Sequence, residues 1–365
     1  MASNRKRAVV RRRRAVAFVG LIVLVVAAVN AVDAVSHSTE TTTIPSAPAT
    51  TGVPPLRSPF PVGSLSFTVT EPATSSAAAR TLTTYVRYPA VPGTGGPQTP
   101  ATPYRGSGPF PLVVFSGGYA VSPETYSTLL DAWAAAGYVV ADPDYPFTTP
   151  TSAGALDESD IVNHPGDLSA VITALLNANG RTGPRAAAGA ARVLVGTIQP
   201  AEIAAIGHSD GGDVTIAATA DPCCRDPRIG AAVVLSGAEN IVFGSTFFAT
   251  LPANSLRALP LLVVQGTDDS INPEGCSVQL YDQAPPPKYY LSMVGQSHQS
   301  PYIDAGSPLA TVQGVTTDFL NGTLKGSGGA LASMATAGNV PGASMLFAGT
   351  PTGLPDGTCP DAPGN

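Results

Sequence analysis

Hydrophobic positions recur along this chain with two different periods, and each period predicts a different kind of element. Between residues 65 and 88 the period is two: Leu65, Phe67 and Val69 fall on one face of a strand, and the β-branched and aromatic run Arg80–Tyr88 follows. This alternation predicts an antiparallel strand pair. From residue 112 onward, short continuous apolar runs predict buried strands, at residues 112–115, 138–141, 204–206, 231–235, 261–264 and 289–294.

Segments with helical spacing lie between these strands. In residues 123–136 apolar positions recur three and four apart, with Ser122 as the expected N-cap, Pro123 in the first turn and Gly137 as the stop. Further helices are predicted at 166–179, after residue 209, and at 309–324. Together the pattern predicts an α/β fold. We expect a mostly parallel central sheet with helices on both faces and the antiparallel strand pair at its N-terminal end.

The N-terminal 35 residues have the composition of an export signal. Seven of the 19 basic residues lie within the first 14 positions, and the apolar run Ala15–Val29 follows directly. Small residues at 32–34 allow cleavage by signal peptidase, but the run, extended through Val35, could instead stay as a membrane anchor. We therefore predict an exported protein, either secreted or anchored to the outer face of the cytoplasmic membrane.

Three further segments follow this signal. Residues 36–61 are mainly Ser, Thr, Pro and Ala, with almost no large apolar side chain, so we expect a disordered linker. Residues 62–326 carry the strand and helix pattern and are assigned to one catalytic domain. The Gly-, Ala- and Pro-rich residues 327–365 are expected to form a loosely packed tail.

The charge of the exported part restricts its partners. After residue 34 the chain has 12 basic and 24 acidic residues, a net charge of about −12. Such a charge argues against nucleic acid and other polyanions. The oligomeric state stays open.

Four cysteines lie in the exported part, where disulfides are chemically allowed: Cys223, Cys224, Cys276 and Cys359. A bridge between the adjacent Cys223 and Cys224 would be strained, so we expect each of them to pair with Cys276 or Cys359. Free buried thiols are the alternative, and the spacing does not fit zinc ligation.

One motif carries candidate chemistry. The apolar run 204–206 leads into Gly207-His208-Ser209-Asp210-Gly211 and then into an Ala-rich helical segment. Strand, Gly-x-Ser-x-Gly and helix in this order are typical of a nucleophile elbow, where a strained turn exposes the serine. The motif alone is modest support, because a glycine-rich chain contains it by chance fairly often.

A nucleophilic serine needs a histidine base and a carboxylate that orients it. The chain has four histidines: His37 lies in the linker, His164 before a helix, His208 in the elbow with its side chain expected to point away, and His298 in a loop directly after a strand. Loops at the carboxyl ends of strands are where active sites of open α/β sheets lie. His298 is therefore the candidate base.

The candidate acid lies in the loop after strand 261–264. Asp268 and Asp269 both occur there, and the residues alone do not decide between them. A plain turn is the alternative role for this pair. The order Ser, Asp, His along the chain favours catalysis.

Six pieces of residues 65–324 match one family, in order: Val86–Ala90, Pro111–Tyr119, Asp167-Leu168, the elbow, Gly266-x-x-Asp269-x-x-x-Pro273 and Ser297-His298. The chain resembles the α/β-hydrolases, and within them the branch of chlorophyllases, platelet-activating-factor acetylhydrolase and cutinase-like polyester hydrolases. The resemblance implies Asp269 as the acid. It also implies an oxyanion hole made by the backbone N–H groups of Asp210 and Tyr119, because Gly118-Tyr119-Ala120 is similar to the Gly-Tyr-Thr of cutinase-like enzymes.

These residues predict an exported serine hydrolase that cleaves carboxylic esters of lipid, short acyl or polyester type, with no cofactor and no metal. The apolar segment Ala238–Ala258 would either border an acyl pocket or pack in the core. Two other interpretations stay open: an amidase, peptidase or envelope acyltransferase using the same three residues, and a catalytically silent binding protein with the same fold.

Overall fold

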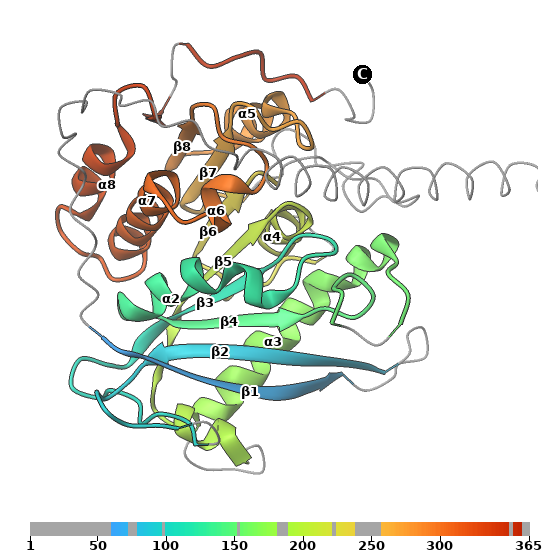
Figure 1. Cartoon of the computed structure of the whole chain (residues 1–365), viewed down its shortest axis with the longest axis vertical. Coiled ribbons are helices and arrows are strands. Elements are labelled where there is room, and N and C mark those ends of the chain that lie inside the picture. Colours follow the sequence, from blue (N-terminus) through green and yellow to red (C-terminus); the bar gives the residue numbers. More distant parts are fainter. Residues whose placement is uncertain are drawn as a thin grey trace, which may run out of the picture. The chain divides into compact units, whose positions relative to one another are not determined.

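A nine-stranded sheet forms the centre of the structure, a computed structural model that describes residues 60–71, 79–96, 99–151, 154–180, 189–220, 224–237, 257–349 and 353–359. Within these ranges the strands are β1 (Val62–Glu71), β2 (Arg80–Pro89), β3 (Phe110–Ser116), β4 (Val139–Asp144), β5 (Ile198–His208), β6 (Ala231–Leu235), β7 (Leu261–Gly266), β8 (Lys288–Met293) and β9 (Ser344–Ala348). Their order across the sheet is β1-β2-β4-β3-β5-β6-β7-β8-β9 (Figure 1).

The centre of this sheet is parallel and its two ends are antiparallel. The six strands from β4 through β3, β5, β6 and β7 to β8 all pair in parallel. The predicted N-terminal pair is confirmed, because β1 and β2 pair antiparallel with Leu65 opposite Val86. The carboxyl ends of the parallel strands therefore lie along one edge, and the loops after β3, β5, β7 and β8 meet there.

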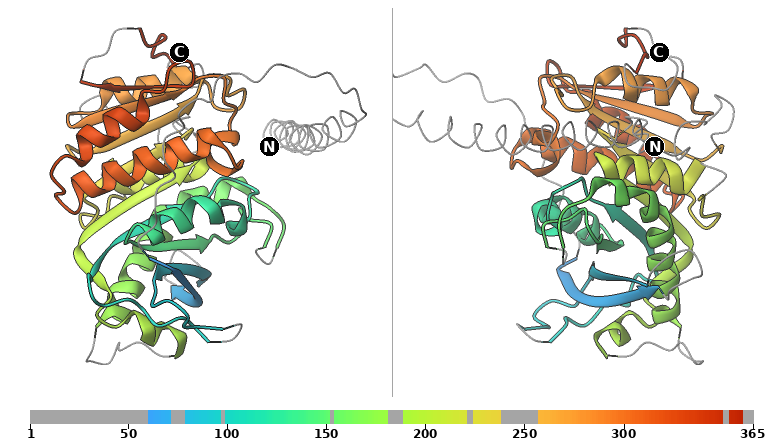
Figure 2. Two further views of the ribbon diagram at one scale, coloured as in Figure 1. Left: turned by 60° about the vertical axis from the view of Figure 1, so that its left-hand side comes forward. Right: turned by 90° about the vertical axis from the view of Figure 1, so that its right-hand side faces the viewer.

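Helices cover both faces of the sheet, as predicted (Figure 2). One face is covered by α2 (Ser127–Ala135), α6 (Ser300–Ile303), α7 (Ser307–Thr323) and α8 (Ala330–Gly338). The other is covered by α3 (His164–Asn179), α4 (Asp210–Ala220) and α5 (Glu274–Gln283). Three short 3₁₀ segments, η1 (Pro123–Tyr126), η2 (Glu158–Asn163) and η3 (Gly189–Leu194), complete the described elements.

Successive side chains of the central strands enter opposite cores. In β3, Val113 and Phe115 pack beneath α2, whereas Leu112 and Val114 pack beneath α3. Because both faces are covered, all seven residues of β3 are buried, and the sequence shows a continuous apolar run rather than an alternation. This explains why the parallel strands could be found from hydrophobicity alone.

The helix predicted at 123–136 is shorter and differently capped. Its first turn is the 3₁₀ segment η1, and α2 follows from Ser127. Ser122 makes no side-chain cap, since its hydroxyl lies 3.3 Å from that of Thr125. The predicted stop is confirmed, because Gly137 has a φ of 93°.

The expectation of a loosely packed segment after residue 326 is wrong for residues 330–348. Helix α8 packs beside α7, and β9 pairs antiparallel with β8, with Leu346 opposite Leu291. Met334 of α8 is buried in the same core as α2 and α7. Burial of these few apolar side chains orders a stretch whose composition is otherwise typical of loops.

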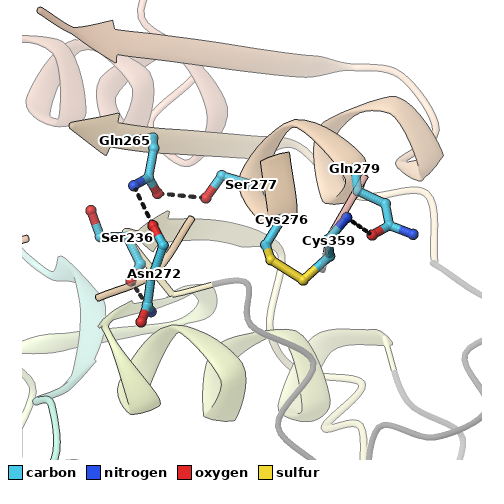
Figure 3. The surroundings of a disulfide bond; sticks show 7 residues. All are labelled: Ser236, Gln265, Asn272, Cys276, Ser277, Gln279 and Cys359. Carbon is cyan, nitrogen blue, oxygen red and sulfur yellow. Dashed lines mark hydrogen bonds between the residues drawn. A yellow bond between two sulfur atoms is a disulfide. The ribbon is translucent and has the colours of Figure 1, made fainter. Parts of the chain in front are cut away.

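The predicted cysteine pairing is also wrong. Cys276 on α5 forms a disulfide with Cys359, not with Cys223 or Cys224 (Figure 3). Cys224 is disulfide-bonded as well, and its partner is neither of these two. The physical reason is that the C-terminal segment packs against α5, where the backbone N–H of Cys359 donates to the Gln279 side chain at 3.0 Å.

Several predictions concern residues outside the described ranges. These are the export signal at 1–35, all but the end of the linker at 36–61, most of the segment 238–258, and Cys223. None of the helices in the described ranges combines the length and the hydropathy needed to span a bilayer. The Cys276–Cys359 disulfide is consistent with export.

Candidate active site

The turn between β5 and α4 places Ser209 in a strained backbone conformation. Its φ is 55°, in the left-handed region that residues other than glycine rarely adopt. A Cβ added at Gly207 would lie 1.8 Å from the carbonyl oxygen of Gly211, and one added at Gly211 would lie 1.9 Å from that of Ser116. Both glycines of the motif are therefore required by sterics, as a nucleophile elbow demands.

Ser209, His298 and Asp269 come together from three loops at the carboxyl edge of the sheet. The Ser209 Oγ lies 2.9 Å from the Nε2 of His298, and the Nδ1 of the same ring lies 2.8 Å from the Oδ2 of Asp269. A carboxylate only accepts hydrogen bonds, so Nδ1 carries the imidazole proton and Nε2 accepts from the serine hydroxyl. This tautomer is the one a general base needs.

Hydrogen bonds saturate the Asp269 carboxylate. Its Oδ1 accepts from the backbone N–H groups of Ile271 and Asn272, both at 2.9 Å, while the Gln265 Nε2 donates to Oδ2 at 3.0 Å. Burial alone would raise the pKa of Asp269, but the hydrogen bonds from His298, Asn272 and Ile271 outweigh it and hold the pKa below its usual value. The side chain is therefore an oriented carboxylate at neutral pH.

The structure distinguishes the two neighbouring aspartates. Asp269 has a fully buried side chain on His298, whereas Asp268 is exposed and lies near the hydroxyl of Thr267. Of the two, Asp269 is therefore the one that contacts the imidazole of His298.

Sequence reasoning missed one residue that supports Asp269. Gln265, the buried penultimate residue of β7, receives a hydrogen bond from Ser277 of α5 at 2.7 Å and donates to the carbonyl of Asn272 at 3.1 Å (Figure 3). Asn272 in turn donates to the carbonyl of Ser236. A single polar residue in an apolar strand was the signal that could have identified Gln265, since buried amides are normally hydrogen-bonded.

The glycine loop after β3 lies against Ser209. A Cβ added at Gly118 would lie 3.0 Å from the Cβ of Ser209, so any larger residue would crowd the serine. The loop then turns back at Ala120, which has a φ of 58° and donates its N–H to the Thr148 carbonyl at 2.8 Å. Tyr119 stands between these two positions, partly exposed. On the other side of Ser209, Asp210 begins α4, and the dipole of that helix has its positive end there.

Neither of the other two histidines in the described ranges, His164 and His208, is hydrogen-bonded to the Ser209 hydroxyl. His164 is the first residue of α3, where it is buried and stacked on Tyr145 with ring centroids 4.1 Å apart. The predicted role of His164 at a helix entry agrees with this position. His208 is fully buried, and its Nε2 lies 2.9 Å from the carbonyl oxygen of His298. His37 lies outside the described residues.

Comparisons with known proteins support the architecture. No protein-family model matches the chain, and no curated protein matches it in sequence. Among solved structures, the chain is similar to a ferulic acid esterase from Streptomyces cinnamoneus, with a TM-score of 0.54 and 21% sequence identity over 73% of this chain and 91% of that one. The chain has the α/β-hydrolase fold.

Within the α/β-hydrolase fold of this chain, the three polar side chains lie after three of the parallel strands. Ser209 follows β5, the fifth of nine strands across the sheet, and Asp269 and His298 follow β7 and β8. The glycine loop follows β3, the direct neighbour of β5. The fold therefore brings a hydroxyl, an imidazole and a carboxylate of this chain within hydrogen-bonding distance of one another.

Proposed function

We propose that this protein is a serine hydrolase that cleaves carboxylic esters through an acyl-enzyme intermediate. The observation that carries the proposal is the continuous hydrogen-bonded line from the Ser209 Oγ through His298 to Asp269, with distances of 2.9 and 2.8 Å. The strained elbow that presents Ser209 adds to it, because backbone strain of this kind is concentrated at functional sites.

The first half of the reaction transfers the acyl group to the protein. The Ser209 Oγ attacks the ester carbonyl carbon while its proton passes to the Nε2 of His298. The resulting tetrahedral oxyanion collapses when the bond to the alcohol oxygen breaks, and His298 gives its proton to that oxygen. Asp269 stays ionised throughout and stabilises the imidazolium.

The second half releases the acid. A water molecule attacks the acyl carbon, and His298 takes one of its protons. The bond from the acyl carbon to the Ser209 Oγ then breaks, and the proton returns to the serine. The backbone N–H groups of Tyr119 and Asp210 are the proposed donors to the oxyanion in both halves, and each such donor typically lowers the barrier by about 3 kcal/mol.

The substrate class and location belong to the same proposal. The family resemblance favours esters of lipid, short acyl or polyester type, as in chlorophyllases and cutinase-like hydrolases. The ferulic acid esterase with the similar fold is an esterase by name. The basic and apolar N-terminal residues, together with the Cys276–Cys359 disulfide, favour export, with the apolar run either cleaved or kept as an anchor.

The test is turnover of matched ester and amide substrates. We expect the protein to hydrolyse p-nitrophenyl esters of graded chain length far faster than the corresponding anilides, with a preferred chain length that defines the acyl class. Ser209→Ala should be inactive on all of them. Faster amide turnover would replace the ester proposal with an amidase or peptidase, and transfer to an added alcohol in preference to water would indicate an acyltransferase. Absence of all turnover would leave a silent binding protein.

A further inference from the structure

A buried hydrogen-bonded chain runs beneath Ser209 and is not used by the proposed mechanism. The backbone N–H of Gly118 lies 3.1 Å from the Tyr126 hydroxyl, and this hydroxyl lies 2.8 Å from the Nδ1 of His208. The Nε2 of His208 lies 2.9 Å from the carbonyl oxygen of His298. Both linking side chains, Tyr126 and His208, are almost completely buried.

The direction of every bond in this chain follows from chemistry. The His298 carbonyl only accepts, so the Nε2 of His208 must carry a proton. Burial lowers the pKa of His208 to about 3, so the ring is neutral and has no second proton. Its Nδ1 therefore accepts from the Tyr126 hydroxyl. The phenol oxygen, which keeps its proton because burial raises the pKa of Tyr126, accepts in turn from Gly118.

The hydrogen-bonded chain connects three segments that must stay aligned for catalysis. Gly118 belongs to the glycine loop after β3, His208 directly precedes Ser209, and His298 belongs to the loop after β8. His208 also packs against the rings of His298 and Tyr302, at centroid distances of 4.8 and 4.9 Å, so it cannot turn without disturbing its neighbours.

The hydrogen-bonded chain also restricts which backbone N–H groups of the glycine loop can face an oxyanion. The N–H of Gly118 is engaged by Tyr126, and that of Ala120 by Thr148. Among the described residues, none accepts from the N–H of Tyr119, which lies between them. Holding Gly118 on one side and Ala120 on the other thus leaves Tyr119 as the donor of this loop.

We infer that Tyr126 and His208 are positioning residues, which hold the Tyr119 N–H and the His298 imidazole in register with the Ser209 hydroxyl. The inference rests on the proposed ester hydrolysis and adds to it two residues that touch neither the substrate nor the reacting atoms. Losing the Tyr126 hydroxyl removes the acceptor of Gly118 and the donor of His208 at the same time. Misplacement of reacting groups by about 1 Å can reduce a rate by about 100-fold.

The test compares Tyr126→Phe with Tyr302→Phe in the full chain. Tyr302 is an equally buried tyrosine against the same His208 ring, but its hydroxyl bonds to Ser236 and to the carbonyl of Val264. We expect Tyr126→Phe to lower kcat for a p-nitrophenyl ester about 10- to 100-fold with KM changed less than about threefold. Tyr302→Phe should keep kcat within about threefold when rates are normalised to folded protein.

A spectroscopic measurement separates positioning from general stability. In ¹⁵N-histidine-labelled protein, NMR of the ring nitrogens should show His208 purely in the Nε2–H form, with the signals assigned by their loss in His208→Gln. In Tyr126→Phe the His298 carbonyl still holds the proton on Nε2, but Nδ1 loses its hydrogen-bond donor. We therefore expect the Nδ1 resonance of His208 to move downfield in Tyr126→Phe and to keep its wild-type position in Tyr302→Phe. His208→Gln keeps one donor and one acceptor and should retain more activity than His208→Leu.

The outcomes for this inference and for the proposed function can be told apart. If the wild type hydrolyses esters and Tyr126→Phe matches it in kcat and in the position of the His208 Nδ1 resonance, the positioning role is refuted while the esterase stands. If Tyr302→Phe loses as much kcat as Tyr126→Phe, the effect is general packing, and the inference fails again. If the wild type itself hydrolyses no ester, both proposals fall together.

Discussion

Two buried histidine–aspartate clusters lie within the described part of this protein, and only one of them has the arrangement of an active site. The Ser209 cluster consists of Ser209, Asp269 and His298. In it the carboxylate binds the imidazole at 2.8 Å, and the imidazole reaches a hydroxyl on a strained elbow. The hydroxyl end faces the edge of the sheet where the loops meet.

The Arg80 cluster, made of Arg80, Asp160, His164 and Asp167, also pairs aspartate with histidine, but it contains an arginine in place of the serine. Its guanidinium binds both carboxylates with two hydrogen bonds each, at 2.6 to 2.9 Å. His164 lies 3.6 Å from Asp160, and burial lowers its pKa. In the Arg80 cluster, the carboxylate of Asp167 binds an arginine and so holds α3 against β2. In the Ser209 cluster, the carboxylate of Asp269 binds an imidazole and two backbone N–H groups, and it can therefore orient a base.

The largest expected difference between the clusters is in catalysis. We expect His298→Gln to lower kcat/KM for a p-nitrophenyl ester by about 10⁴-fold, because Ser209 then has no base. His164→Gln, a matched change of the other buried histidine, should leave kcat/KM within about twofold per folded molecule. Equal losses in the two variants would remove the distinction drawn here.

The next largest effect on the rate is expected from a change at the Asp269 carboxylate. Asp269→Asn should lower kcat about 10³- to 10⁴-fold, because an amide nitrogen next to Nδ1 favours the wrong imidazole tautomer. Asp268→Asn, one residue away and exposed, is the control and should keep wild-type kcat. Steady-state kinetics on both variants makes this comparison, and a loss confined to Asp268→Asn would reassign the acid.

The Arg80 cluster should respond in stability instead of rate. Arg80→Met leaves Asp160 and Asp167 buried without a counter-ion, and we expect it to lower the free energy of unfolding by about 3 kcal/mol. Arg105→Met, at an exposed arginine, should cost less than about 1 kcal/mol. Urea unfolding of each variant, with kcat/KM measured before unfolding, tests this, and a stable but inactive Arg80→Met protein would contradict the structural role.

The smallest expected effect is the pH dependence of that stability. Burial alone would raise the pKa of Asp160, but the hydrogen bonds from His164, Arg80 and Asn163 outweigh it and lower the pKa from 3.8 to about 2. A depressed pKa contributes stability that is present above pH 4 and is lost as the pH falls through 2. The difference in unfolding free energy between wild type and Asp160→Asn should therefore be about 2 kcal/mol at pH 6 and shrink toward pH 2. A difference that grows on acidification would contradict the assignment.

The hydrophobic pattern and the order of the motifs predicted those elements whose structure is determined by residues close together in the sequence. The parallel strands were found because burial on both faces makes them continuously apolar, and the elbow because sterics demand glycine at positions 207 and 211. Helix α8 and β9 were missed, since their composition resembles a tail and their order comes from packing on α7 and β8.

The three residues of the candidate site could be predicted from the sequence, but the buried residues that hydrogen-bond to them could not. The order Ser, Asp, His indicated Ser209 and His298, while the choice of Asp269 needed a family resemblance. The proposed positioning role of His208 depends on hydrogen bonds to the hydroxyl of Tyr126, which lies 82 residues earlier in the chain, and to the carbonyl of His298. The pairing of Cys276 with Cys359 likewise depends on the course of the C-terminal segment along α5, and the spacing of the cysteines does not predict that course.

The central claim is that Ser209 is an activated nucleophile. Treating the full-length protein with a fluorophosphonate and mapping the adduct by mass spectrometry tests it most directly. We predict one adduct per molecule, on the peptide that contains Ser209, with Ser209→Ala unlabelled and His298→Gln labelled far more slowly. An unlabelled wild type, or a Ser209→Ala protein labelled as fully as the wild type, would contradict the claim.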